Sequence, residues 1–183
     1  METWMQKAQK VEKILARAPK FDKFLRVEED EFRARQQALI AKIAEAGIDC
    51  ALVYSDEHYC GDVPYLGGCV NISIEPVAGV LGKNGFHILA GLEGGYVAEQ
   101  LGARAGCGIH KVEMLKLADE EYPIDAEHIE DVLVEACGQM PRNVGLFTPR
   151  AVLPVGVYEY FASLVGEENM IDCQEIYYKQ KYI

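Results

Sequence analysis

A nearly continuous apolar segment that directly follows a glycine constrains the fold of this chain most. It spans residues 48–54, Ile-Asp-Cys-Ala-Leu-Val-Tyr. A strand covered on both faces requires such a run, because neither face can carry many polar side chains. Residues 28–46 begin with four acids, continue with apolar residues at helical spacing, and are followed by Gly47, which is typical of a helix C-terminus. A helix that leads directly into a buried strand indicates an α/β domain.

The rest of the chain continues this alternation. Strands are predicted at residues 72–82 and 86–90, and Asn84-Gly85 between them is a strong signal for an antiparallel hairpin. Apolar patterns predict further helices at 92–101, 125–137 and 152–165, and further strands at 109–115, 144–147 and 170–173. We therefore predict an α/β fold, a three-layer α/β/α sandwich with a mixed sheet of about six strands that includes one antiparallel hairpin.

Residues 1–27 are predicted to be an amphipathic arm that precedes one domain at 28–183. Apolar residues recur in the arm at steps of three and four, and Pro19 is expected to end the helix; they are Trp4, Ala8, Val11, Leu15 and Ala18. Phe21, Phe24 and Leu25 would give it a second apolar anchor. Packing of this helix on its own domain is the favoured interpretation, and a contact with a second copy of the chain is the alternative.

Charge is distributed unevenly between these two parts. Residues 1–27 carry seven Lys or Arg and three acids, whereas the remaining residues carry 11 Lys or Arg and 26 acids. An acidic body repels phosphate backbones, so a nucleic acid is not expected as a direct ligand. We also expect no membrane association, because there is no apolar run of membrane-spanning length and no signal-like N-terminus. The six cysteines form no C-x-x-C pair and are expected to be reduced thiols in a cytoplasmic protein.

Two short motifs give the chain a resemblance to a known family. The first is Gly47-Ile48-Asp49, which leads into a strand. The second is residues 62–68, which come close to the pattern Asn-x-x-Tyr-Leu-Thr-Gly. Tyr65 and Leu66 match this pattern, whereas Asp62 replaces its Asn and Gly67 replaces its Thr. This order of parts resembles the N-terminal domain of the creatinase/prolidase family, which includes Xaa-Pro aminopeptidases and Xaa-Pro dipeptidases. At the other end, residues 171–172 and 181–183 resemble the last strand and the Arg-x-Ile-Lys linker of that domain, with Lys181 in place of the Arg. We therefore expect a fragment that ends at a domain boundary.

The resemblance implies a division of labour between two domains. The following catalytic domain would hold two divalent metal ions, such as Mn, through two Asp, one His and two Glu, and would hydrolyse the bond before proline or, as in creatinase, an amidino C–N bond. Those ligand motifs cannot be placed in this sequence, so no catalytic or metal-binding residue is predicted in it. The resemblance also implies a homodimer and, in the full-length protein, a proline-containing peptide substrate.

The non-catalytic half of such a protein helps to build the dimer and covers a neighbouring active site. Here that role would fall to the irregular stretch 55–71, which is expected to be a long loop. The candidate residues in this loop are Asp56, His58, Asp62, Tyr65 and Asn71. The tail is expected to present an exposed aromatic patch to the chain's own catalytic domain, with Tyr178, Lys181 and Tyr182 as contact residues and Tyr177 beside them. An alternative function is a protein- or peptide-binding module of a catalytically inactive relative, such as a histone-chaperone subunit.

Two clusters suggest a metal site but lack the ligand spacing of a known one. One is the loop group Asp56, Glu57, His58, Cys60 and Asp62, and the other is the C-x-x-H spacing of Cys107 and His110. A solvated polar loop and a buried cysteine are the favoured interpretations. His87, beside the hairpin turn, is expected to face solvent.

Overall fold

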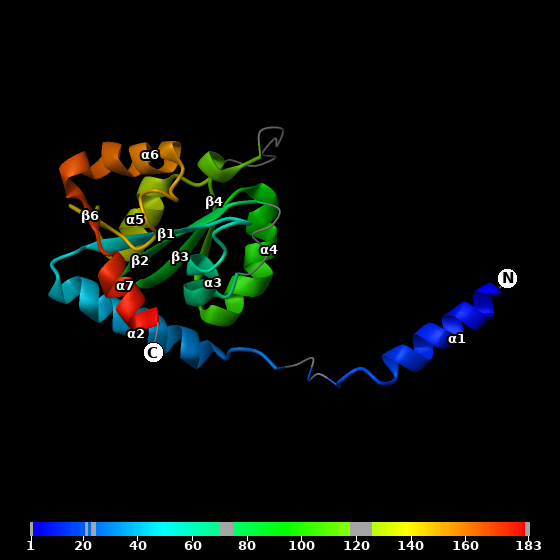
Figure 1. Ribbon diagram of the computed structural model, residues 1–183. Coiled ribbons are helices and arrows are strands. Elements are labelled where there is room, and N and C mark those ends of the chain that lie inside the picture. Colours follow the sequence, from blue (N-terminus) through cyan, green and yellow to red (C-terminus); the bar gives the residue numbers. More distant parts are fainter. Residues whose placement is uncertain (1, 21, 23–24, 70–74, 118–125, 182–183) are drawn as a thin grey trace.

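In the computed structural model, a twisted mixed sheet lies between two layers of helices (Figure 1). The structure describes all residues except 1, 21, 23–24, 70–74, 118–125 and 182–183. Within the described residues the sheet has six strands in the order β4-β3-β2-β1-β5-β6. The neighbours of β2 run antiparallel to it, and the pairs β3–β4, β1–β5 and β5–β6 are parallel. The predicted fold class is confirmed.

The elements have the following bounds. The helices are α1 (Trp4–Leu15), α2 (Glu29–Glu45), α3 (Asp62–Gly67), α4 (Leu92–Gly102), α5 (Ile129–Cys137), α6 (Val155–Val165) and α7 (Gln174–Lys181). The strands are β1 (Cys50–Ser55), β2 (Val77–Gly82), β3 (Gly85–Ala90), β4 (Gly108–Lys111), β5 (Val144–Leu146) and β6 (Met170–Asp172). Short 3-10 helices lie at Ala103–Ala105, Glu113–Leu115 and Glu167–Asn169.

Strand β1 is the centre of the core, and all six of its residues are buried. Leu52 and Tyr54 point to the face covered by α5 and α6, whereas Ala51 and Val53 point to the face covered by α2, α3, α4 and α7. This alternation divides the apolar side chains into two clusters, one on each side of the sheet. The apolar run at 48–54 therefore folds as predicted.

The local signals on either side of β1 are also confirmed. Helix α2 has Glu29, Asp30 and Glu31 in its first turn, where negative charge is favourable to the helix dipole. Gly47 follows the helix with φ 71°, a left-handed conformation that glycine adopts without strain. Strands β2 and β3 form the hairpin around Asn84, with Gly82 opposite Gly85. The described cysteines are free thiols, and four of them are buried.

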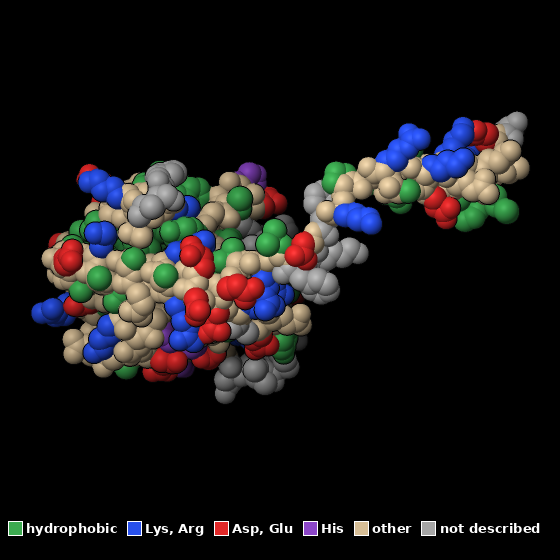
Figure 2. All heavy atoms as spheres, turned by 90° about the horizontal axis from the view of Figure 1, so that it is seen from below, with side chains coloured by type: hydrophobic (Ala, Val, Ile, Leu, Met, Phe, Trp, Pro, Cys, Tyr) green, Lys and Arg blue, Asp and Glu red, His purple; other side chains and the backbone are tan. Residues whose placement is uncertain are grey.

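The structure corrects the prediction for the N-terminal arm. Helix α1 forms at the predicted place and is capped by Thr3, but none of its twelve residues is buried. The helix stands away from the body of the molecule (Figures 1 and 2). Its apolar side chains are exposed, including Trp4 at 80% and Leu15 at 65%. The favoured interpretation, in which the arm packs on its own domain, was therefore wrong.

A second correction concerns the stretch 55–71, which was predicted to be an irregular loop. Its second half contains helix α3, which begins at Asp62 and ends where Gly68 adopts φ 67°. Val63 and Leu66 of this helix belong to the core cluster on the α2 face. Residues 56–61, before this helix, form a loop at the surface. Among the described residues, no helix combines the length and the apolarity needed to cross a lipid bilayer.

Candidate functional site

The structure brings together residues from the predicted loop and from the C-terminal tail. Helix α7 lies against the start of α3, so that side chains about 115 residues apart in the sequence touch. We call this contact region the α3–α7 seam. It consists of Tyr54, Tyr59, Asp62, Tyr65, Phe147, Thr148, Tyr177, Tyr178 and Lys181.

Asp62 is the charged centre of the seam and is fully buried. One carboxylate oxygen accepts a hydrogen bond from Nζ of Lys181 at 2.8 Å, and the other accepts one from the Thr148 hydroxyl at 2.6 Å. The Thr148 hydroxyl also accepts from the backbone N–H of Tyr54 at 2.9 Å. Asp62 is thus tied to the carboxyl ends of the adjacent parallel strands β1 and β5.

The carboxyl ends of parallel strands are where open α/β sheets usually bind ligands. Here that position is occupied by the chain's own Asp62–Lys181 pair, whose Lys181 side chain is 23% exposed. Because Asp62 is fully buried and paired with Lys181, its carboxylate is not accessible to a substrate. The seam is therefore built to fix α7 to the domain.

Aromatic packing completes the seam. Tyr177 is fully buried, and its ring stacks on Phe147 with centroids 4.8 Å apart. Its hydroxyl donates to the backbone carbonyl of Asp62 at 3.4 Å. Burial and then the nearby Asp62 carboxylate raise the pKa of Tyr177 far above its ordinary value, so the hydroxyl keeps its proton and remains a donor.

The predicted exposed aromatic patch was wrong for Tyr177. Tyr178 is half-buried, and its hydroxyl lies 2.7 Å from that of Tyr59. The third predicted contact residue of the tail, Tyr182, lies outside the described residues. Residues four apart lie on the same face of a helix, so Cys173, Tyr177 and Lys181 all face the domain.

The predicted active-site-covering residues divide into two groups. Asp56 and His58 lie in the surface turn after β1, where a carboxylate oxygen of Asp56 accepts from the backbone N–H groups of His58 and Tyr59 at 2.9 and 2.7 Å. Asp62 and Tyr65 are instead part of the seam, since the Tyr65 hydroxyl donates to the carbonyl of Gln180 at 3.5 Å. Asn71 lies outside the described residues.

Neither metal cluster considered in the sequence forms as a unit. Both oxygens of Asp62 are engaged in the seam, away from His58. Cys107 packs on the α2 face of the sheet, whereas His110 faces α5 and contacts His87. Burial raises the pKa of Cys107 to about 12, so this thiol stays protonated. The C-x-x-H spacing therefore does not indicate that these two residues bind one metal ion.

The prediction that His87 faces solvent was also wrong. Its strand is the second from the sheet edge and is covered by α5, which leaves the residue only 6% exposed. Burial and then the neighbouring His110 lower the pKa of His87, so the ring is neutral at neutral pH. No sequence signal pairs these two histidines, because their contact depends on the register of β3 against β4.

Comparison with solved structures identifies the fold. Neither a protein-family model nor a curated protein sequence matches this chain. Its architecture is similar to part of the structures of peptidases of the prolidase and X-Pro aminopeptidase kind. This likeness confirms, at the level of the fold, the resemblance found in the sequence.

Three solved structures illustrate the likeness, each with a TM-score of 0.53. The prolidase from Pyrococcus horikoshii OT3 is 10% identical, and the match covers 82% of this chain and 35% of that one. The dipeptidase PepE from Mycobacterium ulcerans is 15% identical, with 85% and 38% covered. The X-Pro aminopeptidase from Thermotoga maritima MSB8 is 16% identical, with 80% and 35% covered. The chain thus spans little more than a third of the length of these structures.

Proposed function

We propose that this chain is the non-catalytic N-terminal domain of a cytoplasmic, dimetal Xaa-Pro dipeptidase or aminopeptidase. The observation that carries the proposal is its fold, which matches about a third of each of three peptidase structures. In this proposal, the two divalent metal ions, such as Mn, and the proline-containing peptide are bound by the catalytic domain that follows. The domain described here positions that partner and helps to cover its active site.

The surface available for covering an active site is the turn at residues 56–60. Glu57, His58 and Cys60 are exposed in it, whereas Asp62 and Tyr65 are held in the seam and anchor the turn at its far end. The tail offers a second surface, the exposed side of α7. It borders a groove of about 480 Å³ against α2, lined by Lys42, Glu45, Ala46, Ile176, Lys179 and Gln180. We assign contact with the catalytic domain to this side of α7.

The chain alone is expected to show no hydrolysis of Xaa-Pro dipeptides, with or without added manganese or cobalt. The physical reason is that, in this proposal, the metal ligands belong to the catalytic domain that follows, and the carboxylate at the end of the parallel strands is buried and paired with Lys181 and Thr148. The measurement is release of free proline from a dipeptide such as Ala-Pro. Metal-dependent turnover that is lost in His58→Gln would refute the proposal.

The parent gene provides a second test, which distinguishes the peptidase from a binding module. The reading frame that continues past residue 183 in the parent gene should encode spaced Asp, Asp, His, Glu and Glu ligands. If it encodes a domain without them, the chain is the protein-binding module of an inactive relative, and its acidic body would suit a basic partner.

Homodimerisation through α1 is the third expected result. The helix exposes Trp4, Val11 and Leu15, and an apolar stripe without a partner on its own domain favours contact with a second copy. Sedimentation of the chain with Val11→Glu and Leu15→Glu should give half the mass of the unmodified chain. Lys13→Ala on the same helix is the control, because Lys13 is an exposed polar residue. An unchanged mass in the double variant would show that α1 does not mediate dimerisation.

A further inference from the structure

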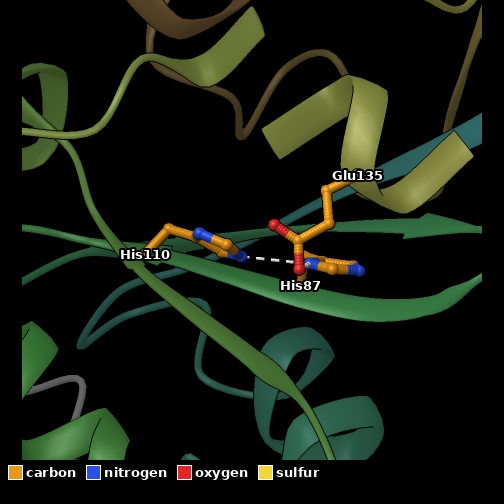
Figure 3. A group of neighbouring side chains, drawn as sticks. All are labelled: His87, His110 and Glu135. Atoms are coloured by element: carbon orange, nitrogen blue, oxygen red, sulfur yellow. Dashed lines mark hydrogen bonds and ion pairs between the residues drawn. The ribbon is translucent and has the colours of Figure 1, made fainter. Parts of the chain in front are cut away.

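Two histidines from neighbouring strands meet beneath α5. The register of the parallel strands β3 and β4 places His87 opposite Gly108 and Leu89 opposite His110, so both histidines point to the α5 face. Nδ1 of His87 lies 3.0 Å from Nε2 of His110, and the ring centroids are 5.2 Å apart. Both residues are almost fully buried, at 6% and 5% exposure. The two imidazoles thus face each other through one nitrogen each (Figure 3).

Gly108 leaves space beside these two nitrogens. A Cβ atom at this position would lie 2.5 Å from Nδ1 of His87 and 2.9 Å from Nε2 of His110. Any other residue would therefore fill the place where both nitrogens can reach a third atom. The glycine is needed here for space, since its φ is not in the left-handed region.

Glu135 supplies a third possible metal-ligand atom from helix α5. Its carboxylate projects from α5 toward His87, with one oxygen 3.9 Å from Nδ1 (Figure 3). The three possible ligand atoms, one each from His87, His110 and Glu135, all lie within 4.8 Å of one another. The Glu135 side chain is 62% exposed, so the cluster has a path to solvent although the imidazoles are buried.

Glu127 fixes the orientation of the His110 ring. Its carboxylate lies 2.8 Å from Nδ1 of His110, and because a carboxylate only accepts, Nδ1 must carry the proton. Nε2 then holds a lone pair, which accepts a hydrogen bond from Nδ1 of His87 in the metal-free pair and is available to a metal ion when that bond is replaced. A carboxylate behind a histidine ring is the usual outer-shell arrangement around a protein-bound metal ion.

We propose that His87, His110 and Glu135 bind one zinc ion, with the fourth coordination position open to water. Two imidazole nitrogens and one carboxylate oxygen are ligands that zinc accepts. Bonds from zinc to histidine of about 2.0–2.1 Å in a tetrahedron place the two nitrogens about 3.3 Å apart. The observed 3.0 Å therefore has to widen by only a few tenths of an ångström. Zinc replaces the hydrogen bond between the rings, and the single proton of His87 moves from Nδ1, where it bridges to His110, to Nε2.

A bound ion would add a side-chain link between helix α5 and the two hydrogen-bonded strands beneath it. It would connect β3, the edge strand β4 and helix α5 through side chains that the sequence places 23 to 48 residues apart. This inference does not depend on the proposed function, because the site lies on the α5 face and the seam on the opposite side of the sheet.

The experiment is titration of the full chain with zinc at neutral pH, followed by calorimetry. We expect one equivalent to bind, and Glu135→Gln to weaken binding at least tenfold. Loss of the outer-shell carboxylate in Glu127→Gln should weaken it about 10- to 100-fold. Because Glu127 and Glu135 are largely exposed, both variants should keep the fold, which circular dichroism would verify.

Two controls separate this site from adventitious binding. Glu159→Gln removes one exposed carboxylate from α6 and should leave zinc affinity unchanged. Cys60→Ser removes an exposed thiol and should also leave it unchanged. The proposal is overturned if the chain binds no zinc, since the histidines are then only a hydrogen-bonded pair. It is equally overturned if Glu135→Gln binds zinc as tightly as the unmodified chain.

Discussion

Tyr177→Ala is expected to lower the free energy of unfolding of this domain by about 3–5 kcal/mol, the range for deleting a large buried aromatic side chain. Tyr177 is fully buried and stacks on Phe147 with an angle of 6° between the rings. It also packs edge-on against Tyr65, at a centroid distance of 6.0 Å. Truncation would remove the aromatic centre of the seam and leave a cavity between α7 and the sheet. Urea unfolding monitored by circular dichroism measures the change.

Tyr177→Phe is the matched control for this prediction. It keeps the ring and removes only the hydroxyl, which donates to the Asp62 carbonyl at 3.4 Å. The expected loss is about 0.5–1.5 kcal/mol, the net contribution of one ordinary hydrogen bond. A loss below about 1 kcal/mol in Tyr177→Ala would mean that α7 is not packed into the core, because surface substitutions cost no more than about half of that.

Local signals in the sequence were sufficient to predict the sheet. Gly47 and Asn84-Gly85 mark a helix end and a hairpin because those backbone positions favour particular residues regardless of the rest of the chain. The apolar run at 48–54 predicts a doubly covered strand for a similar reason, since both faces of β1 must be apolar. Each of these inferences depends on residues that are close together in the sequence.

The candidate sites could not be predicted in the same way, because they depend on long-range contacts. Asp62 and Lys181 are 119 residues apart, and His87 and His110 meet only through the register of two strands. The prediction for the tail was wrong because its aromatic residues were assigned to contact with the catalytic domain, whereas Tyr177 packs in the core and Lys181 points inward to Asp62. The arm shows the converse limit: its periodicity predicts a helix correctly, but periodicity cannot tell which surface an apolar stripe covers.

Lys181→Met should destabilise the domain by about 3 kcal/mol, near the lower end of the range for removing one partner of a buried ion pair. The loss removes the positively charged partner of the fully buried Asp62 carboxylate, which keeps its hydrogen bond from the Thr148 hydroxyl. The lower end applies because Lys181 is 23% exposed, so water can partly replace its ammonium group. Asp62→Asn should cost less, about 1–2 kcal/mol, since Lys181 can turn toward solvent.

The double variant Asp62→Asn with Lys181→Met tests the same pair from the other side. It contains no unpaired buried charge, so its destabilisation should be smaller than the sum of the two single losses. Lys179→Met is the control on the same helix, because Lys179 pairs with Glu175 at the surface with both side chains more than 70% exposed. Exposed pairs of this kind contribute at most about 0.5 kcal/mol. If Lys181→Met were no more destabilising than Lys179→Met, the neutral hydrogen bonds to Asp62 would be enough to hold it, and the ion pair would not be what fastens α7 to the domain.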